Sequence, residues 1–287
     1  MNGAPAVNDA LTAPPVPATS RLSVIVITRD EESRLRACLE SVAFADECVV
    51  VDGGSRDGTV ALAQQLGARV IVTPDWPGFG RQKQRALDAA RGTWVLSIDA
   101  DEWVDEALAQ AIRGVVESPE TAHGDATAPT AYNVDRLSAL CGRWMEHGSW
   151  QPDPCLRLFR RGSARFSDDL VHERLICDGL IARLPGRLLH NSLPRLEQAL
   201  EKMNRYSSGR AQDLAARGRR GGLGPAIGHG LWAFVRGYLL RRGFLDGRLG
   251  FVLAVLDAEA AYYRHLKVWL DAEPLSHPLP APRRPRG

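Results

Sequence analysis

Two carboxylates one residue apart are the most chemically suggestive feature of this sequence. Asp99 and Asp101 stand in the tripeptide Asp-Ala-Asp directly after the apolar run Thr93–Ile98. In a tight turn both side chains can share a divalent cation, because hard cations such as Mg²⁺ and Mn²⁺ bind oxygen ligands. Such a cation would neutralise the charge of a diphosphate. Acidic residues after a strand also commonly cap the following helix, so the tripeptide alone leaves two interpretations.

A second acidic turn occupies the matching place after another apolar run. Asp52 follows Glu47–Val51 and opens the turn Asp-Gly-Gly-Ser. In open α/β sheets, ligands bind beyond the carboxyl ends of the strands. The spacing therefore predicts a single nucleotide pocket with Asp52, Asp99 and Asp101 around it.

These turns require a sheet of parallel strands to position them. Apolar, β-branched runs alternate with helical segments, which is typical of a doubly wound, mostly parallel α/β sheet. The expected strands are Leu22–Thr28, Glu47–Val51, Arg69–Val72 and Thr93–Ile98. The expected helices are Glu31–Val42, Thr59–Leu66, Gln82–Ala90 and one through Ala107, Ile112 and Val115.

Beyond the polar loop Ser118–Thr130 the pattern changes. Short strands are expected at Ala131–Leu137, Leu156–Arg160 and Leu180–Leu184. They predict a mixed extension of the sheet. Helices are then expected at Leu196–Ala216, Ala226–Leu240 and Leu249–Leu270. We predict a sheet domain over 21–192 and a helical extension over 193–273. Residues 1–20 and 274–287 are expected to form a disordered leader and a disordered tail.

Composition excludes several classes of protein. The 287 residues carry a formal net charge of only +2, which argues against a general nucleic-acid binder. The five cysteines form no CxxC pair, which argues against a disulfide scaffold and against a structural zinc site. We therefore expect a reducing, cytoplasmic compartment.

Three motifs, in order, resemble the family 2 glycosyltransferases of the GT-A fold. They are SVIVITRDEE, VVVDGGSRDGT and WVLSIDADEW, and the resemblance extends from about Leu22 to His190. The segments TPDWPGFGRQKQRAL, VHE and RGYLLRRGFLDGRLGF resemble a bacterial subgroup that builds the lipopolysaccharide inner core, often described as β-1,4-glucosyltransferase-like. The resemblance implies an α/β, Rossmann-like GT-A catalytic domain (a nucleotide-diphospho-sugar transferase fold) with a mixed, mostly parallel sheet and a C-terminal helical extension.

The resemblance assigns donor-binding roles to residues near the carboxyl ends of the strands: Thr28, Glu31, Asp52, Lys83, Asp99 and Asp101. Asp52 would contact the base, although Gly53 stands where many relatives carry a second aspartate. Asp99 would bind the ribose or the metal. Asp101 would bind the Mg²⁺ or Mn²⁺ ion that bridges the diphosphate.

Inversion by direct displacement needs one carboxylate that takes the proton of the acceptor hydroxyl. Relatives carry an acidic residue on a loop after the Asp-X-Asp turn, and Glu173 is the best match; Asp168 and Asp169 are the alternatives. Each of these three could instead be a surface or capping residue. His190 is expected either to be a further metal ligand or to be a histidine with a purely structural role.

Two further groups of residues allow alternative interpretations. Three tryptophans could stack on sugar faces, or belong to the core or its rim: Trp76, Trp144 and Trp150. Three arginines could meet an anionic acceptor, or simply face solvent: Arg157, Arg160 and Arg161.

Arginines flank the apolar, aromatic-rich helices near the C-terminus. No apolar run there reaches the roughly 18 to 20 residues that a membrane span needs. Amphipathic helices of this kind suit a membrane surface with anionic lipids, so we expect peripheral attachment at the inner face of the cytoplasmic membrane. The alternative is a helical pair that packs on the catalytic domain.

The resemblance therefore implies an inverting, metal-dependent hexosyltransferase. Its first expected substrates are UDP-glucose and a glycolipid acceptor, a lipopolysaccharide core heptose. A sugar-phosphate nucleotidyltransferase is disfavoured, because the loop Thr28–Glu32 is acidic and lacks the glycines and triphosphate grip of that class. A non-catalytic membrane scaffold that keeps the fold is the remaining alternative, and a dinucleotide dehydrogenase is disfavoured because no GxGxxG follows the first strand.

Overall fold

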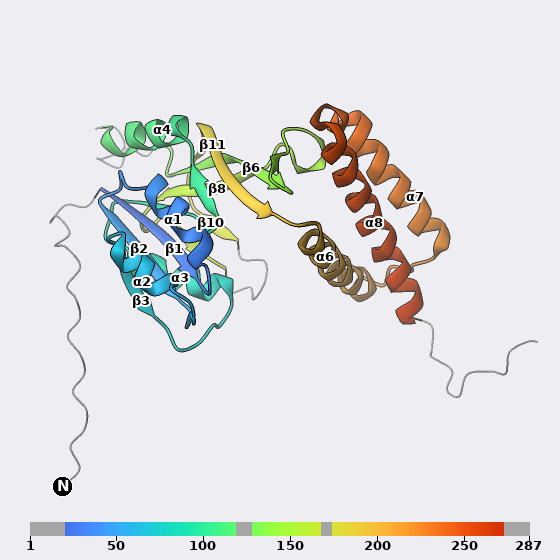
Figure 1. The fold of residues 1–287 in the computed structure, drawn as a ribbon, viewed down its shortest axis with the longest axis horizontal. Coiled ribbons are helices and arrows are strands. Elements are labelled where there is room, and N and C mark those ends of the chain that lie inside the picture. The colour runs from blue at the N-terminus through green and yellow to red at the C-terminus, as the bar shows by residue number, and fades with distance from the viewer. Residues whose placement is uncertain (1–20, 119–127, 168–173, 273–287) are drawn as a thin grey trace, which may run out of the picture. The chain divides into compact units, whose positions relative to one another are not determined.

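The computed structural model describes residues 21–118, 128–167 and 174–272. The chain divides into two compact units. The first comprises the chain up to Leu137 together with Asp153–Asn191, and the second comprises Ser138–Pro152 together with the chain from Ser192 onward (Figure 1).

Four parallel strands form one half of the sheet in the first unit. They are β1 (Leu22–Thr28), β2 (Glu47–Asp52), β3 (Arg69–Val72) and β4 (Trp94–Ser97), in the order β3-β2-β1-β4. All seven residues of β1 are buried, which is expected of a parallel strand covered on both faces. These strands confirm the parallel part of the predicted GT-A-like, mixed sheet.

Alternate residues of β1 enter two different cores. Val24 and Val26 pack with α1 (Glu32–Ser41), α2 (Thr59–Gln65) and α4 (Glu106–Glu117), whereas Ile25 and Ile27 pack with α3 (Phe79–Ala89). Because successive side chains of a strand point to opposite faces, the helices cover both sides of the sheet. The parallel strands are thereby held rigidly, with their carboxyl ends at one edge.

Four further strands complete the sheet beyond β4, in the order β8 (Pro154–Arg160), β6 (Ala131–Leu140), β11 (Ile181–Leu193) and β5 (Glu102–Val104). The pairs β4–β8, β8–β6 and β11–β5 are antiparallel. A separate two-stranded sheet joins β9 (Ala164–Phe166) to β10 (Leu175–Cys177). The predicted end of a strand at Leu184 is wrong, because β11 continues through Pro185-Gly186, a pair that usually marks a turn. Gly186 adopts a φ of +91°, and a Cβ there would stand 2.2 Å from the backbone nitrogen of Leu108.

Replacing Gly186 by alanine is expected to lower the free energy of unfolding by about 2 to 4 kcal/mol, because the methyl group meets α4 and the backbone is left-handed. Urea unfolding would measure the change. The control is Gly114→Ala within α4, where an added Cβ meets nothing within 4 Å and alanine should stabilise by about 1 kcal/mol. A Gly186→Ala protein as stable as wild type would contradict this close packing.

The second unit is built from helices around a short extended segment. Its helices are α6 (Leu196–Ala216), α7 (Leu223–Phe234), the π-helical turn η2 (Val235–Leu240), the 3₁₀ turn η3 (Gly243–Asp246) and α8 (Gly247–Ala272). The segment carries β7 (Arg143–Trp144) and the 3₁₀ turn η1 (Gly148–Trp150). The helix expected over Ala226–Leu240 thus changes its winding after Phe234.

Polar contacts join that segment to the helices of the same unit. The Asp246 carboxylate accepts hydrogen bonds from the backbone N–H of His147 over 2.9 Å and lies 2.8 Å from His147 Nδ1. Ser149 Oγ donates to Asp257, and Arg241 donates to the Ser149 carbonyl over 3.2 Å. Within the part of the chain that the structure describes, no helix is long and apolar enough to span a bilayer.

Candidate active site

The ends of β1 and β2 meet through a buried hydrogen-bond cluster. Thr28 Oγ1 donates to Asp52 Oδ2 over 2.9 Å, and the backbone N–H groups of Gly54 and Ser55 donate to Asp52 Oδ1 over 3.0 and 2.8 Å. Thr28 and Asp52 are both buried. In this structure Asp52 shapes its own turn with both carboxylate oxygens, and its contact with a nucleobase stays a prediction.

Further hydrogen bonds cross-link the loops that follow these two strands. The backbone N–H of Glu31 donates to Thr59 Oγ1 over 2.8 Å, and that of Asp30 donates to Ser55 Oγ over 2.9 Å. Asp30 Oδ1 in turn accepts from the backbone N–H of Arg56 over 2.7 Å. The two loops therefore form one fixed surface at the sheet edge.

Gly53 lies against the indole ring of Trp76. A Cβ on Gly53 would stand 2.2 Å from Trp76 Cε3, so a side chain at this position would displace the ring. Trp76 is half-buried and meets Phe79 edge to face, with ring centroids 5.4 Å apart. A second aspartate at position 53, which the resemblance expects in many relatives, would therefore collide with Trp76 in this structure.

Asp99 is held between two cations. Lys83 Nζ lies 2.8 Å from Asp99 Oδ1, and the Arg157 guanidinium lies 2.9 Å from Asp99 Oδ2. Burial raises the pKa of the Asp99 carboxyl, but the charges of Lys83 and Arg157 outweigh burial and hold that pKa well below its usual range. Asp99 is therefore ionised, and the structure brings it together with Lys83, as expected of two donor-binding candidates.

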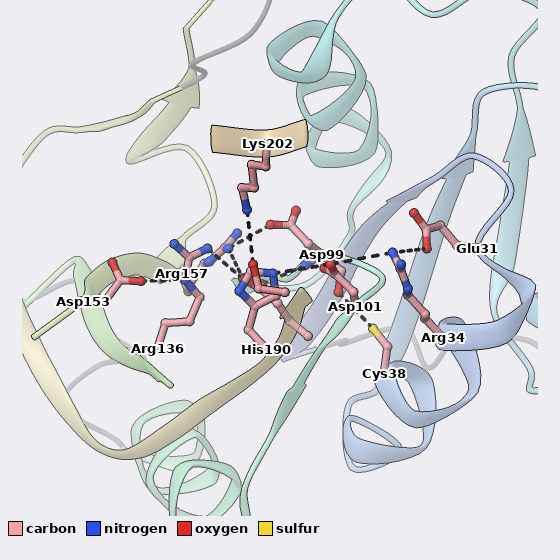
Figure 2. A network of polar contacts seen from close by, with 12 residues as sticks. Glu31, Arg34, Cys38, Asp99, Asp101, Arg136, Asp153, Arg157, His190 and Lys202 are labelled. Carbon is pink, nitrogen blue, oxygen red and sulfur yellow. Dashed lines mark hydrogen bonds and ion pairs between the residues drawn. The ribbon is translucent and has the colours of Figure 1, made fainter. Parts of the chain in front are cut away.

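Arg157 does not face solvent, so that interpretation of it is wrong, and its contact with an anionic acceptor stays a prediction. Arg157 is buried, and its guanidinium lies 2.6 Å from the fully buried carboxylate of Glu102. Arg136 also reaches Glu102, over 3.2 Å, and pairs with Asp153 over 2.9 Å. This network supports the Asp-Ala-Asp turn through the contact of Arg157 with Asp99 (Figure 2). The Asp99 N–H also donates to Glu102 over 3.0 Å.

Sequence reasoning missed Glu102 and Arg136. Their partners come from strands that are distant along the chain, and no local pattern reports such pairings. The only local signal was an acidic residue, Glu102, directly after Asp101 at the start of an otherwise apolar strand.

Asp101 and His190 are brought together by the pairing of β5 with β11. His190 is in register with Glu102, and its Nε2 lies 3.4 Å from Asp101 Oδ2. Arg34 lies 4.0 Å from Asp101 and 3.4 Å from Glu31 (Figure 2). Burial raises the pKa of Glu31; Arg34 opposes this effect, and the charge of Asp101 adds to it. The four side chains, two carboxylates with one guanidinium and one imidazole, form a partly solvated corner beside Asp99.

The capping interpretation of the Asp-Ala-Asp turn is wrong. The helix that follows, α4, is capped by Asp105, whose carboxylate accepts the Leu108 N–H over 2.8 Å. The two carboxylates of the turn are therefore not used by that helix.

The Asp101 corner fits a cation that a diphosphate helps to bind. Among the described residues, no group of three or more His, Cys, Asp or Glu side chains could hold a metal ion. Mg²⁺, however, is typically held by one or two carboxylates plus phosphate oxygens and water. Asp101 and His190 supply one carboxylate and one imidazole at a common point, so the donor set suits a shared site and not a closed protein cage.

The other candidates are dispersed or outside the described residues. Glu173, Asp168 and Asp169 belong to the latter group. Trp144 lies in β7 and Trp150 packs against a small core of the second unit. In the first unit, Arg160 ends β8, and Arg161 donates to the Gly92 carbonyl over 2.9 Å.

Replacing Arg157 by methionine is expected to destabilise the protein by about 3 kcal/mol or more at neutral pH, because the Glu102 and Asp99 charges lose a buried partner. The folded-state pKa of Asp99 is depressed, so its contribution is present at neutral pH and is lost as the pH falls below about 4. The difference between variant and wild type should therefore shrink in acid, as measured by urea unfolding at two pH values. The control is Arg36→Met, which removes an exposed pair with Glu40 and should cost under about 1 kcal/mol.

Comparison with known proteins gives a consistent result. The family described as glycosyl transferase family 2 matches residues 23–136. The lipopolysaccharide core biosynthesis glycosyltransferase LpsC of Rhizobium meliloti is 31% identical over 258 residues, which are 85% of this chain and 93% of that protein. An uncharacterized glycosyltransferase of Rickettsia typhi is 32% identical over 258 residues, 86% of each chain.

Among solved structures, the mannosyltransferase PcManGT of Pyrobaculum calidifontis, in complex with GDP-Man and Mn²⁺, has a similar fold. The TM-score is 0.50 at 17% sequence identity, and the match covers 93% of this chain and 92% of that one.

Proposed function

Because this chain belongs to glycosyl transferase family 2, we propose that it is an inverting, metal-dependent hexosyltransferase that uses a nucleotide-diphosphate sugar, with UDP-glucose as the first candidate. The acceptor is a hydroxyl of a glycolipid, a lipopolysaccharide core heptose. The observation that supports this acceptor is the similarity to LpsC, a lipopolysaccharide core glycosyltransferase, over 93% of that relative.

The donor lies across the carboxyl ends of β1, β2 and β4. The cross-linked loops carrying Thr28, Glu31 and Asp52 border the nucleoside. Lys83 stands at the same edge with its ammonium 2.8 Å from Asp99, where it can contribute positive charge to the diphosphate. Asp99, which Lys83 and Arg157 hold in place, binds the ribose or the metal in this proposal.

Asp101 and His190 would hold the divalent cation, Mg²⁺ or Mn²⁺. When bound, the cation supplies charge that stabilises the leaving diphosphate. Their separation of 3.4 Å and partial exposure support this assignment.

Glu173 is the general base. The acceptor oxygen forms a bond to the anomeric carbon while the bond from that carbon to the diphosphate oxygen breaks, and Glu173 takes the hydroxyl proton. Displacement from the opposite side inverts the anomeric configuration. Asp168 and Asp169 are the alternative bases.

The enzyme acts at the inner face of the cytoplasmic membrane, where a glycolipid acceptor is available. A non-catalytic scaffold is disfavoured, because the Asp99, Lys83 and Asp101 side chains are arranged around one edge of the sheet. A nucleotidyltransferase is disfavoured by the membership of the glycosyltransferase family.

A donor screen tests the proposal. Purified protein is incubated with a panel of nucleotide sugars, with and without lipopolysaccharide core acceptor, and release of nucleotide diphosphate is measured. We expect acceptor-dependent release of UDP from UDP-glucose, with a β-linked product by NMR. Folded protein that turns over no nucleotide sugar would contradict the proposal, and an α-linked product would contradict inversion.

A further inference from the structure

In the turn between α7 and α8, large apolar side chains are exposed and small residues are buried. Four large apolar side chains of this turn are 46 to 63% exposed: Leu239, Leu240, Phe244 and Leu245. Apart from Asp246, the buried residues at the turn and directly beside it are the glycines Gly237, Gly243 and Gly250. A Cβ on Gly250 would stand 1.8 Å from the Gly243 carbonyl oxygen, and one on Gly243 would stand 2.8 Å from the Gly237 carbonyl oxygen. The backbones therefore pack directly on one another, and the large side chains are directed outward.

The adjoining helix α7 repeats this arrangement. Its buried residues are Ala226 and Gly230, and a Cβ on Gly230 would stand 3.1 Å from the Ala258 carbonyl oxygen of α8. Its large side chains Leu223, Ile227 and Leu231, spaced four residues apart, are 51 to 64% exposed. Residues four apart lie on one helix face, so the helix presents an apolar stripe to its surroundings. Helices of water-soluble domains normally bury such a stripe.

An aromatic cluster supports the turn. The rings of Phe234, Tyr238 and Phe251 lie within 5.4 to 5.6 Å of one another, and Phe244 lies 6.3 Å from Tyr238. Phe244 and Phe251 remain nearly half exposed. The exposed phenylalanine rings extend the apolar surface, and Tyr238 is of the amphipathic aromatic kind that is typical of a membrane interface.

The exposed charges at the turn are all positive. From Leu223 to Leu256 the sequence contains a single acidic residue, Asp246, and that residue is buried against His147. Arg241, Arg242 and Arg248 are exposed among the apolar side chains. An apolar surface ringed only by arginine is complementary to an anionic, apolar layer.

We propose that the α7–α8 turn, residues 239–248, is a docking surface that inserts shallowly into an anionic lipid bilayer. Leu239, Leu240, Phe244 and Leu245 enter the boundary between head groups and acyl chains. Arg242 and Arg248 bind lipid phosphates at the same level. The inference rests on the proposed function only in that an enzyme with a glycolipid acceptor must act at a membrane. The packing of the turn and its exposed charges support the docking surface independently.

A bilayer accounts for these features better than a second copy of the chain does. Two copies would face each other with arginine against arginine and with no exposed acidic side chain to pair with them. A bilayer supplies phosphates in any number and accepts apolar side chains without a matching shape.

The test is co-sedimentation of the full chain with vesicles of phosphatidylcholine, with or without phosphatidylglycerol. Wild type should sediment with the anionic vesicles only. It should be released when salt rises from about 0.1 M to about 1 M, which shortens the screening length from about 10 Å to about 3 Å. The double variant Leu240→Ser/Leu245→Ser and the double variant Arg242→Glu/Arg248→Glu should each lower the partition coefficient by at least about tenfold.

The matched control is Leu180→Ser/Ile181→Ser, which removes two apolar side chains of similar exposure from the first unit and should leave vesicle binding unchanged. Melting temperature and donor turnover are measured for every variant. Wild type that ignores anionic vesicles, or a control that loses binding equally, would overturn the docking surface. The docking surface would also be overturned if the wild type were a dimer and the serine variant a monomer, because the exposed side chains would then bind a second copy of the chain.

These results separate the docking surface from the proposed function. Vesicle binding without turnover of any nucleotide sugar supports the surface and contradicts the transferase. Turnover of a nucleotide sugar without vesicle binding supports the transferase and contradicts the docking surface.

Discussion

A Glu173→Gln protein is expected to bind UDP-glucose with near wild-type affinity and to turn it over about a hundred to ten thousand times more slowly. Glutamine keeps the shape and the hydrogen-bonding capacity of the side chain but cannot take a proton. The residues proposed to bind the donor are different ones, and they lie at the ends of β1, β2 and β4. Affinity by calorimetry and turnover by UDP release would therefore change independently.

Two further variants make this prediction specific. Asp168→Asn and Asp169→Asn remove neighbouring carboxylates and should retain most of the activity. Near wild-type turnover in Glu173→Gln would exclude it as the base and direct attention to Asp168 and Asp169. A loss of donor affinity together with turnover would instead place Glu173 in the nucleotide or metal site.

The parallel half of the sheet was predictable because its determinants are local. A parallel strand with helices on both faces must be apolar throughout, and Leu22–Thr28 shows this directly in the sequence. The helix α6 was also predictable from local spacing, because the apolar residues recur at helical intervals over its observed bounds, Leu196–Ala216. Because the ends of such strands share one edge, the placement of Asp52 and Asp99 followed from strand positions alone.

The support of the site was not predictable from local patterns. Arg157 stands among alternating apolar residues and resembles any half-exposed strand residue. Only the antiparallel pairing of β8 with β4 brings it beside Asp99 and Glu102. The pair Asp101 and His190 similarly depends on β11 continuing past Pro185-Gly186 to reach β5.

The helical unit shows a different limit of sequence reasoning. Periodicity reports where apolar residues recur, but not whether they face inward. Gly243 and Gly250 allow the backbones to pack so closely that no large side chain fits between them. The large apolar residues at the turn are therefore directed outward, and this orientation is visible only in the three-dimensional structure.

Removal of divalent cations is expected to abolish turnover, and Mg²⁺ or Mn²⁺ should restore it. Asp101→Ala should lose about a hundredfold or more in turnover, because the leaving diphosphate loses charge stabilisation. His190→Ala should weaken binding of Mn²⁺ in the presence of UDP, which is measurable by electron paramagnetic resonance without any turnover. The reason is geometric: the two side chains meet at 3.4 Å, and no third acidic, histidine or cysteine ligand joins them among the described residues.

The matched control is Asp105→Ala, which removes the carboxylate that caps α4 a few residues away. It should cost about 1 kcal/mol of stability and leave the metal requirement unchanged. This contrast separates the loss of a ligand from the loss of a nearby acidic charge. Full activity in excess chelator would contradict the metal requirement altogether. Unchanged Mn²⁺ binding in both Asp101→Ala and His190→Ala would place the cation elsewhere. An equal loss of Mn²⁺ binding in Asp105→Ala would show that the overall negative charge at this edge, and not the Asp101–His190 pair, attracts the ion.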